Sequence, residues 1–340
     1  MTKIAINGFG RIGRPSLKII LEKPEMEIVA INDLGDINSL AYLLKYDTAY
    51  GVYNKTVEVE ELPEEEYNFL IIDGQKIKVY ANKEPEKLPW GELGVDVVLE
   101  CTGFFKDTTG AGGHLRAGAK RVIISAPTKD EQIKTIVLGV NHNEITAEDQ
   151  ILSNASCTTN CIAPIMKVLE DNFGVEKSLM STIHSYTSTQ NLVDGASKKD
   201  LRRGRAAAQN TIPASTGAAI ATTKTLPQLI DKFDGMAFRV PTVVGSISDV
   251  VAVVKREVTV GGINDALTKS AQENLKGILS VTDEPLVTHD IIGNPHSVIV
   301  QTELTKVIGG NLVKVVGWYD NEWGYSNRLV ELAEFVGKKI

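Results

Sequence analysis

Short apolar runs alternate with amphipathic stretches through the first half of the chain. The apolar runs fall at residues 3–7, 27–32, 95–100 and 121–125. The stretch at residues 12–21, which follows the first run, has the spacing of a helix. Runs of strand length joined by helices predict an α/β fold with a parallel, doubly wound sheet.

Residues 55–80 interrupt this alternation. TVEVE and KIKVY repeat there with period two, and the residues between them include the turn formers Asp73 and Gly74. Alternating runs on both sides of a turn predict a hairpin, which we expect at the edge of the sheet.

The pattern changes after residue 156. Long β-branched runs with polar breaks follow at residues 235–258, 296–302 and 311–319. They predict a mixed or antiparallel sheet with one face covered by helices. Apolar residues at helical spacing predict helices at residues 156–172, 206–212, from 217 onward, 263–274 and 327–336.

Two patterns on a chain of 340 residues predict two domains, because one hydrophobic core rarely serves this length. We assign the doubly wound domain to residues 1–156 and an α+β domain with the mixed or antiparallel sheet to residues 157–320. The C-terminal helix, within residues 321–340, is expected to pack back on the first domain.

Charge and cysteine content narrow the function classes. A net charge of -7 disfavours binding to a nucleic-acid backbone, which needs clustered cations. Neither a leader pattern nor a run of about 18 apolar residues stands in the sequence, so we expect no secretion and no membrane insertion. Three cysteines and no need for disulfide staples are typical of a reducing compartment, so we expect a cytoplasmic location.

Three spaced glycines follow the first apolar run directly. Gly8, Gly10 and Gly13 precede the first helical stretch, and Asp33 stands at the end of the second run. In a Rossmann-type domain the first glycine permits a tight turn, the second lets the backbone approach a pyrophosphate, and the third allows close helix packing. Asp33 can accept hydrogen bonds from an adenosine ribose. The alternative is a glycine-rich turn with a solvated aspartate, but the register of strand, glycines and acid favours an NAD site.

Cys157 lies in the segment SNASCTTNC, directly before an apolar helical stretch. This places it in a first helical turn, where the helix dipole favours a thiolate. On position alone, a packing cysteine and a nucleophile are both open for Cys157, whereas Cys161, one turn deeper, fits the packing role better. The spacing of the pair lacks the second cluster that a zinc site needs, so we expect no metal.

His184 ends a strand-like run at residues 178–183. A lone histidine is usually structural, but beside a thiolate an imidazolium would lower the pKa of the thiol and exchange a proton with a reacting oxygen. Basic residues at positions 198–205 would ordinarily form a solvated face, yet together with threonine-rich stretches they can also bind a phosphate.

A nicotinamide site and an activated cysteine on one chain indicate a specific reaction. Attack of the thiolate on an aldehyde gives a hemithioacetal, which passes a hydride to the cofactor and becomes a thioester. Transfer of the acyl group to phosphate would keep the energy of the thioester in an acyl phosphate. The sequence therefore predicts an NAD-dependent, phosphorylating aldehyde dehydrogenase.

The chain resembles the glyceraldehyde-3-phosphate dehydrogenase family along its whole length. NGFGRIGR, SNASCTTN, RAAAQNTIP and WYDNEWGYSNR are similar to the motifs of that family and follow in its order. The resemblance implies a small phosphorylated aldehyde as substrate, inorganic phosphate as co-substrate, a cytoplasmic role in glycolysis or gluconeogenesis, and a homotetramer.

The resemblance also implies roles for single residues. Cys157 would be the nucleophile and His184 its base. The C3 phosphate of the substrate would be bound by Thr187 and Arg239. The attacking phosphate would be bound by Ser156, Thr158, Thr216 and Gly217, with Arg203 nearby. The cofactor would contact Gly8, Gly10, Arg11, Ile12, Gly13, Asp33, Ser125 and Asn321, the last through its nicotinamide carboxamide.

The sequence departs from the commonest family pattern in three places. Thr189 stands where many relatives have Asp, Gly195-Ala196 where NAD-specific relatives often have Leu-Pro, and residues 243–245 (Val-Val-Gly) where Pro-Asn-Val is frequent. We therefore expect NAD as the preferred cofactor with some use of NADP.

Three other functions compete with this prediction. An erythrose-4-phosphate dehydrogenase shares the nucleophile motif but hydrolyses its thioester, and Thr187 and the Ser215-Thr216-Gly217 run favour phosphate instead. A thiol hydrolase needs no nucleotide motif. A noncatalytic NAD-binding sensor that responds to oxidant through Cys157 needs no substrate-phosphate residues.

Overall fold

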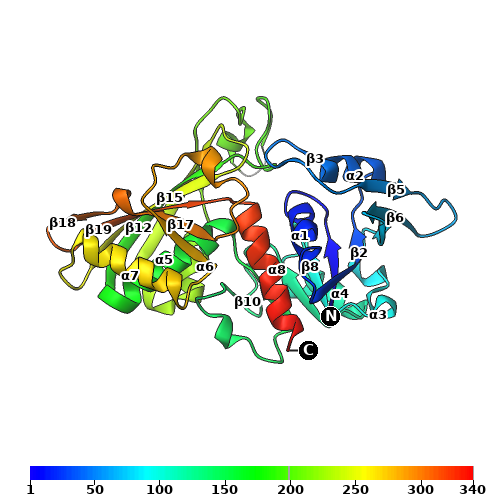
Figure 1. Ribbon diagram of the computed structural model, residues 1–340, viewed down its shortest axis with the longest axis horizontal. Helices are drawn as coiled ribbons and strands as arrows, with labels where there is room; N and C mark the ends of the chain where they lie inside the picture. The colour runs from blue at the N-terminus through cyan, green and yellow to red at the C-terminus, as the bar shows by residue number, and fades with distance from the viewer. Residues whose placement is uncertain (198–199, 340) are drawn as a thin grey trace. The chain divides into compact units, whose positions relative to one another are not determined.

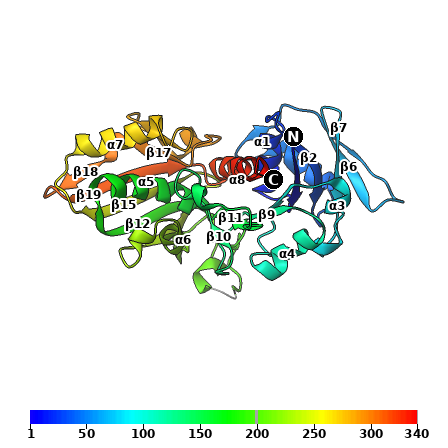
Figure 2. The ribbon, with the colours of Figure 1, turned by 90° about the horizontal axis from the view of Figure 1, so that it is seen from below.

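The computed structural model describes residues 1–197 and 200–339, and the chain divides into two compact units. The first unit contains Met1–Ile136, Asn143–Ala155 and Ser326–Ile340, and the second contains Val137–His142 and Ser156–Tyr325. Figure 1 and Figure 2 label many of the helices and strands of each unit. The domain boundaries that we assigned from the sequence stay a prediction.

The first unit is built on a nine-stranded sheet in the order β10-β11-β9-β8-β1-β2-β7-β6-β5. Its strands are β1 (Thr2–Asn7), β2 (Met26–Asn32), β5 (Val57–Glu60), β6 (Tyr67–Ile72), β7 (Gln75–Tyr80), β8 (Val97–Glu100), β9 (Arg121–Ile124), β10 (Lys134–Thr135) and β11 (Ile151–Ser153). All pairs from β10 to β7 are parallel, which confirms the predicted α/β sheet. The central strands are buried on both faces, as in a sheet covered by helices.

Short connections and helices complete the first unit. The helices are α1 (Gly13–Ile20), α2 (Ile37–Lys45), α3 (Trp90–Leu93), α4 (Thr108–Arg116) and the greater part of α8 (Trp323–Gly337). A two-stranded ribbon joins β3 (Tyr46–Asp47) to β4 (Gly51–Val52).

The edge hairpin forms, but with a different partner from the predicted one. KIKVY lies in β7 and pairs with β6, and Asp73 and Gly74 between them both have positive φ, 47° and 83°, as a two-residue hairpin turn requires. TVEVE supplies β5, which pairs with the far side of β6. The prediction missed that residues 67–72 (YNFLII) form a strand of their own between the two runs.

The second unit contains an eight-stranded mixed sheet in the order β13-β14-β12-β15-β19-β17-β16, with β18 paired to β19. Its strands are β12 (Val175–Ser185), β13 (Ile212–Ser215), β14 (Phe233–Val240), β15 (Ser246–Val254), β16 (Leu279–Thr282), β17 (Val298–Gln301), β18 (Lys306–Ile308) and β19 (Leu312–Tyr319). β12 pairs with β14 in parallel and with β15 antiparallel, so the predicted mixed sheet is confirmed.

Three helices pack on one face of this second sheet, as Figure 2 shows. They are α5 (Cys157–Phe173), α6 (Ala218–Thr225) and α7 (Val260–Gln272). Apolar side chains from these helices and from the inward positions of the strands form one buried core. Cys161 lies fully buried in that core, which agrees with the packing role predicted for it.

The helix predicted at residues 206–212 is absent from the structure, so that prediction was wrong. The segment forms a turn, and Ile212 begins β13, which pairs antiparallel with β14. Pro213 explains the error, because the residue before a proline avoids the helical conformation. The carboxylate of Asp194 also accepts a hydrogen bond from the Ala206 amide at 2.9 Å, which fixes this segment as a loop.

Neither a membrane span nor a metal cluster stands out in the described ranges. Of the helices within residues 1–197 and 200–339, none is long and apolar enough to cross a membrane. Within the same ranges, no three His, Cys, Asp or Glu side chains gather as metal ligands would.

Candidate active site

Cys157 occupies the first residue of α5, as its sequence context predicts. The helix begins at an N-cap, Ser156, whose Oγ accepts a hydrogen bond from the Thr159 amide at 3.1 Å. The Cys157 Sγ lies 3.3 Å from Nε2 of His184, near the end of β12. The structure thus joins a thiol and an imidazole that are 27 positions apart in sequence.

The charges around this pair differ from our expectation. Burial raises the pKa of Cys157, whereas the positive charge of Arg239 and hydrogen bonding to Thr158 act to lower it. Burial, and then the charge of Arg239, lower the pKa of His184 to about 3. We expected an imidazolium to favour the thiolate. In the resting site burial disfavours that charge, and the positive charge that lowers the pKa of the thiol is that of Arg239.

Arg239 lies directly beside His184 because β12 and β14 are parallel neighbours in which these two residues are register partners. Its Nη1 donates to the Ser185 carbonyl at 3.0 Å and lies 2.6 Å from Nδ1 of His184. Burial lowers the pKa of the guanidinium. Among the residues that the structure describes, no carboxylate forms an ion pair with Arg239. The arrangement therefore offers a cation to an anionic ligand.

Asn321 is held with one defined orientation of its amide. Its Oδ1 accepts hydrogen bonds from the Ser185 hydroxyl at 3.0 Å, the Gly245 amide at 2.9 Å and the Ser246 hydroxyl at 3.0 Å. Three donors converge on one atom, so that atom is the amide oxygen and Nδ2 points the opposite way. A fixed amide donor suits recognition of a carbonyl group.

The candidate phosphate residues fall into separate groups. Thr187 and Arg203 both hydrogen-bond to Thr189, at 2.9 Å and 3.2 Å, so the structure brings them together. Thr216 Oγ1 accepts from the Ala218 amide at 3.1 Å, and Gly217 precedes the first turn of α6. No hydrogen bond between described residues joins Thr216 or Gly217 to the Cys157 pair.

In the first unit, the glycine motif forms a tight turn between β1 and α1. Gly8 has φ of 96°, and a Cβ there would lie 2.7 Å from the backbone of Cys101 and Thr102. At Gly13 a Cβ would lie 2.1 Å from the Gly8 carbonyl oxygen, so no larger residue fits. Gly10 faces open space, with no atom within 4 Å of its Cβ position. These are the three roles that the motif requires of its glycines.

A cavity of about 510 Å³ lies beside this turn and is lined by Gly8, Gly10 and Asp33 among others. Asp33 accepts hydrogen bonds from the Phe9 amide at 2.6 Å and the Gly35 amide at 2.8 Å, which fix its carboxylate at the rim. Ile12 is the N-cap of α1. The glycine turn, the open space above Gly10 and the carboxylate fit an adenine dinucleotide.

Two other predicted cofactor residues have structural partners. The Arg11 guanidinium forms an ion pair with Asp47. The Ser125 amide donates to the Glu100 carbonyl at 2.9 Å, which continues the parallel pairing of β8 and β9.

Comparisons with known proteins match one family along the chain. The family profile described as "Glyceraldehyde 3-phosphate dehydrogenase, NAD binding domain" matches residues 2–108, and that described as "Glyceraldehyde 3-phosphate dehydrogenase, C-terminal domain" matches residues 156–321. "Glyceraldehyde-3-phosphate dehydrogenase 2" of Streptomyces avermitilis is 51% identical, with 99% of both chains covered. "Glyceraldehyde-3-phosphate dehydrogenase 1" of Bacillus subtilis is 50% identical, with 99% of this chain and 98% of the relative covered. The protein of that name in Clostridium pasteurianum is 48% identical, with 99% of both chains covered.

The chain belongs to the glyceraldehyde-3-phosphate dehydrogenase family. It is an NAD-dependent oxidoreductase with glyceraldehyde-3-phosphate dehydrogenase function in glycolysis. Its substrate is a small phosphorylated aldehyde. The sequence prediction of family and function is therefore confirmed.

One dehydrogenase site residue escaped the sequence analysis. The hydroxyl of Tyr319 is hydrogen-bonded to Thr158 Oγ1 at 3.0 Å and to Thr182 Oγ1 at 2.7 Å, and its ring meets the His184 ring edge-on. Tyr319 ties the first turn of α5 to β12, and so supports both members of the thiol-imidazole pair. Its one signal in the sequence was its place at the end of a strand, two residues before Asn321.

A departure from the common dehydrogenase pattern falls next to Asn321. Gly245, in the Val-Val-Gly segment, has φ of 96°, and a Cβ there would lie 2.5 Å from the Thr288 side chain. The same glycine donates the backbone hydrogen bond to Asn321. In this chain the departure therefore supports the orientation of Asn321.

Proposed function

We propose that this chain catalyses the phosphorylating oxidation of D-glyceraldehyde 3-phosphate to 1,3-bisphosphoglycerate, with Cys157 as the nucleophile and His184 as the base. The observation that carries the proposal is the 3.3 Å approach of Sγ to Nε2 at the start of α5. A nucleophile and a base within hydrogen-bond reach, with the base held in turn by neighbouring groups, is the arrangement that covalent catalysis needs.

The reaction begins when the Cys157 thiol adds to the aldehyde: the sulfur bonds to the carbon, the thiol proton passes through His184 to the carbonyl oxygen, and a hemithioacetal forms. In the tautomer that acts as the base, the ring proton of His184 is on Nδ1, 2.7 Å from the Ser185 carbonyl, so Nε2 takes the hydroxyl proton as the carbon loses its hydride, which leaves a thioester on Cys157. NAD, when bound, accepts that hydride. An oxygen of inorganic phosphate next attacks the thioester carbonyl, the bond to sulfur breaks, and the acyl phosphate leaves while Cys157 returns as a thiolate.

For NAD we assign the pyrophosphate to the turn of Gly8, Gly10 and Gly13 and to the amides of Arg11 and Ile12. The N-terminus of a helix is a favourable place for phosphate. Asp33 would accept hydrogen bonds from the ribose, and Ser125 would add a further contact. Asn321 would donate from Nδ2 to the nicotinamide carboxamide oxygen, and its threefold-bonded Oδ1 supports that role.

Two phosphate groups need two sets of donors. For the C3 phosphate of the substrate we propose Arg239 and Thr187, because Arg239 is a half-buried cation without a carboxylate partner among the described residues. For inorganic phosphate we propose hydroxyls and amides at the starts of α5 and α6, with one guanidinium nearby. They come from Ser156, Thr158, Thr216, Gly217 and Arg203.

We propose some use of NADP beside NAD. Gly195-Ala196 offers less bulk than the Leu-Pro of many relatives, and the Gly195 amide bonds to the Gly204 carbonyl at 2.8 Å in a close backbone pairing. Lys198 and Lys199, which we considered as partners of the extra phosphate, lie outside the described residues.

We also propose a homotetramer in the cytoplasm. Large apolar side chains are exposed on the second unit, among them Leu179, Ile220 and Ile230 at 65%, 67% and 56%. They line a groove of about 1070 Å³, and apolar surface gathered in this way is typical of an interface. Sedimentation velocity would give the stoichiometry, and a monomer at micromolar concentration would contradict the proposal.

The cysteines support the proposed cytoplasmic location. Cys101, Cys157 and Cys161 are free thiols, which are typical of a reducing compartment.

The activity is tested by the formation of NADH from glyceraldehyde 3-phosphate, with and without inorganic phosphate. We expect a dependence on phosphate and accumulation of an acid-labile acyl phosphate. Efficient NADH formation without phosphate, or a preference for erythrose 4-phosphate, would favour the erythrose-4-phosphate dehydrogenase alternative. NAD binding without turnover of either aldehyde would favour the redox sensor.

A further inference from the structure

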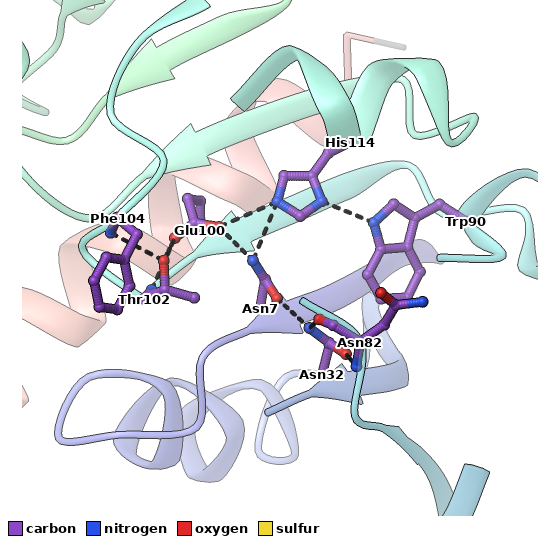
Figure 3. Close-up of polar contacts among 8 residues, drawn as sticks. All are labelled: Asn7, Asn32, Asn82, Trp90, Glu100, Thr102, Phe104 and His114. Carbon is purple, nitrogen blue, oxygen red and sulfur yellow. Dashed lines mark hydrogen bonds and ion pairs between the residues drawn. The ribbon is translucent and has the colours of Figure 1, made fainter. Parts of the chain in front are cut away.

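Three buried polar side chains and the backbone of Asn82 form a row across the carboxyl ends of four neighbouring strands in the first unit (Figure 3). β8 ends at Glu100, β1 at Asn7 and β2 at Asn32, and Asn82 follows β7. The three strand-end residues are register partners, Asn7 with Glu100 on one side and with Asn32 on the other. Asn32 and Asn82 bond to each other twice, at 2.9 Å each. Asn32 Nδ2 donates to Asn7 Oδ1 at 2.7 Å, so the hydrogen bonds are continuous from Glu100 to Asn82.

Glu100 is the centre of this row. Its carboxylate is 1% exposed and accepts from Asn7 Nδ2 at 2.5 Å, from the Thr102 amide at 2.8 Å and from the Thr102 hydroxyl. His114 Nε2 lies 3.1 Å away. A carboxylate buried this deeply costs a great deal of free energy unless donors surround it, and here four donors do.

The chemistry of Trp90 fixes the direction of the His114 bond. The Trp90 Nε1–H can only donate, and it lies 2.9 Å from His114 Nδ1, so Nδ1 accepts. The ring proton is then on Nε2 and is donated to Glu100. Both Trp90 and His114 are 0% exposed, so Glu100 is held from the interior by groups that do not line the cavity.

The opposite side of Glu100 faces the loop that lines the 510 Å³ cavity. From that loop the Thr102 amide and hydroxyl both donate to Glu100, and the Phe104 amide donates to Thr102 Oγ1 at 3.1 Å. The Thr102 backbone also lies directly against the Gly8 turn, where a Cβ would approach to 2.7 Å. A shift of the carboxylate would therefore move the Thr102 loop and the glycine turn together.

We infer that Glu100 is a positioning residue for NAD: anchored by His114 and Trp90, its carboxylate holds the Thr102–Phe104 loop against the Gly8 turn and preforms the nucleotide pocket. The inference rests on our assignment of this cavity to the cofactor. Glu100 need not touch NAD, because it acts through Thr102. A pocket that is formed before the ligand arrives binds more tightly, because the loop loses little conformational entropy when the ligand binds.

The test is Glu100→Gln, with Glu92→Gln as the matched control. The amide keeps the volume of the carboxylate, but it replaces one acceptor oxygen by an NH₂ group. In one orientation this group faces the donors of Asn7 and His114, and in the other it faces the two donors of Thr102. We expect the Kd for NAD and for ADP-ribose, measured by calorimetry, to rise about tenfold or more, the usual effect of losing hydrogen bonds to a charged group. KM for NAD should rise with it, whereas kcat at saturating NAD should change much less. Glu92, exposed in α3, should tolerate the same change.

Alkylation of Cys157 in the cofactor-free protein reports the second unit separately and should keep its wild-type rate in Glu100→Gln. Unchanged Kd values in a folded Glu100→Gln protein would overturn the inference. If this variant fails to fold, the inference is tested with Thr102→Val and Thr102→Ser. Valine removes the hydroxyl that donates to Glu100, whereas serine keeps it. Equal NAD affinity of these two would overturn it as well.

A further variant separates this inference from the cavity assignment. Gly10→Val adds a side chain in open space, so it should fold and block the cavity. Loss of NAD binding in Gly10→Val with normal binding in Glu100→Gln would refute only the positioning role. Normal NAD binding in Gly10→Val would refute the cavity assignment, and the positioning inference with it.

Discussion

The two polar sites of this dehydrogenase differ in how fully the protein satisfies its own charges. In the first unit, the buried Glu100 carboxylate receives four hydrogen bonds. In the second, the Arg239 guanidinium donates to a backbone carbonyl, lies 2.6 Å from His184 Nδ1, and has no carboxylate partner among the described residues. A satisfied buried charge fixes a shape, whereas an unsatisfied one favours a ligand of opposite sign.

The difference indicates how the two sites work. If the cavity beside Gly8 is the nucleotide pocket, as proposed, its buried carboxylate is paired before NAD binds, whereas Arg239 in the reaction site gains an anionic partner only with its substrate. Arg239 lowers the pKa of His184, so a phosphate group that pairs with Arg239 would raise that pKa again and make the imidazole a better base. The base would then become effective when the correct substrate is bound. The predictions that follow separate the two sites.

The largest effect is expected from Cys157→Ser, which should remove the chemistry of one site and leave the other intact. Aldehyde oxidation should fall on the order of 10⁴-fold or more, as for other enzyme nucleophiles, because an alcohol ionises far less readily than a thiol. NAD affinity should be unchanged. Cys161→Ser, in the same helix, should keep most of the activity. Turnover by Cys157→Ser near the wild-type rate would rule out the covalent mechanism.

His184→Asn should slow hydride transfer by about 10²–10⁴-fold, the contribution of a positioned base. Pre-steady-state NADH formation measures this step directly. Because the charge of Arg239 acts to lower the pKa of Cys157, the pH profile of Cys157 alkylation should move less in this variant than in Arg239→Leu. The opposite order would mean that an imidazolium, and not the guanidinium, stabilises the thiolate.

Local signals explain which parts of these sites could be predicted from sequence. The glycine turn and the placement of Cys157 at a helix start depend on residues within one turn, and in the structure Ser156 caps that helix. The helix predicted at residues 206–212 failed although its pattern was local, because pairing with β14 and Pro213 outweighed it. The spacing of neighbouring residues therefore predicts a helix or strand best where the segment does not also pair with a strand that is distant in sequence.

Partners that are distant in sequence explain what was missed. Tyr319 meets Thr182 and Thr158 at separations of 137 and 161 residues, and Glu100 meets Asn7 at 93. Such contacts depend on strand order, which no single motif encodes. For the same reason the sequence could name Arg239 but not its position beside His184.

Arg239→Leu should change substrate selection more than cofactor binding. The ratio of kcat/KM for glyceraldehyde 3-phosphate to that for glyceraldehyde should fall roughly 10–100-fold, because a charge-assisted contact to phosphate is lost. Removal of the cation also raises the pKa of Cys157, so alkylation should need a higher pH. Arg256→Leu, at an exposed arginine, is the control. An unchanged ratio would show that Arg239 does not read the phosphate.

The smallest effect is expected at Asp33, at the rim of the preformed pocket. Its carboxylate would repel the 2′-phosphate of NADP, so we expect the wild type to prefer NAD and to use NADP measurably. Asp33→Gly should raise kcat/KM for NADP about tenfold, a modest gain because the carboxylate is only partly buried and like charges repel less where water screens them. An NADP preference in the wild type would contradict this role of Asp33.

Asp33→Asn separates the charge of Asp33 from its part in the loop. The carboxylate accepts hydrogen bonds from the Phe9 and Gly35 amides, and glycine removes both, whereas asparagine keeps one acceptor oxygen and the size of the side chain. If charge excludes NADP, Asn should raise kcat/KM for NADP as Gly does while NAD affinity falls less than in Gly. A gain in Gly without a gain in Asn would mean that loop geometry, and not repulsion, selects the cofactor, and the first unit would then discriminate by the shape that its hydrogen bonds impose.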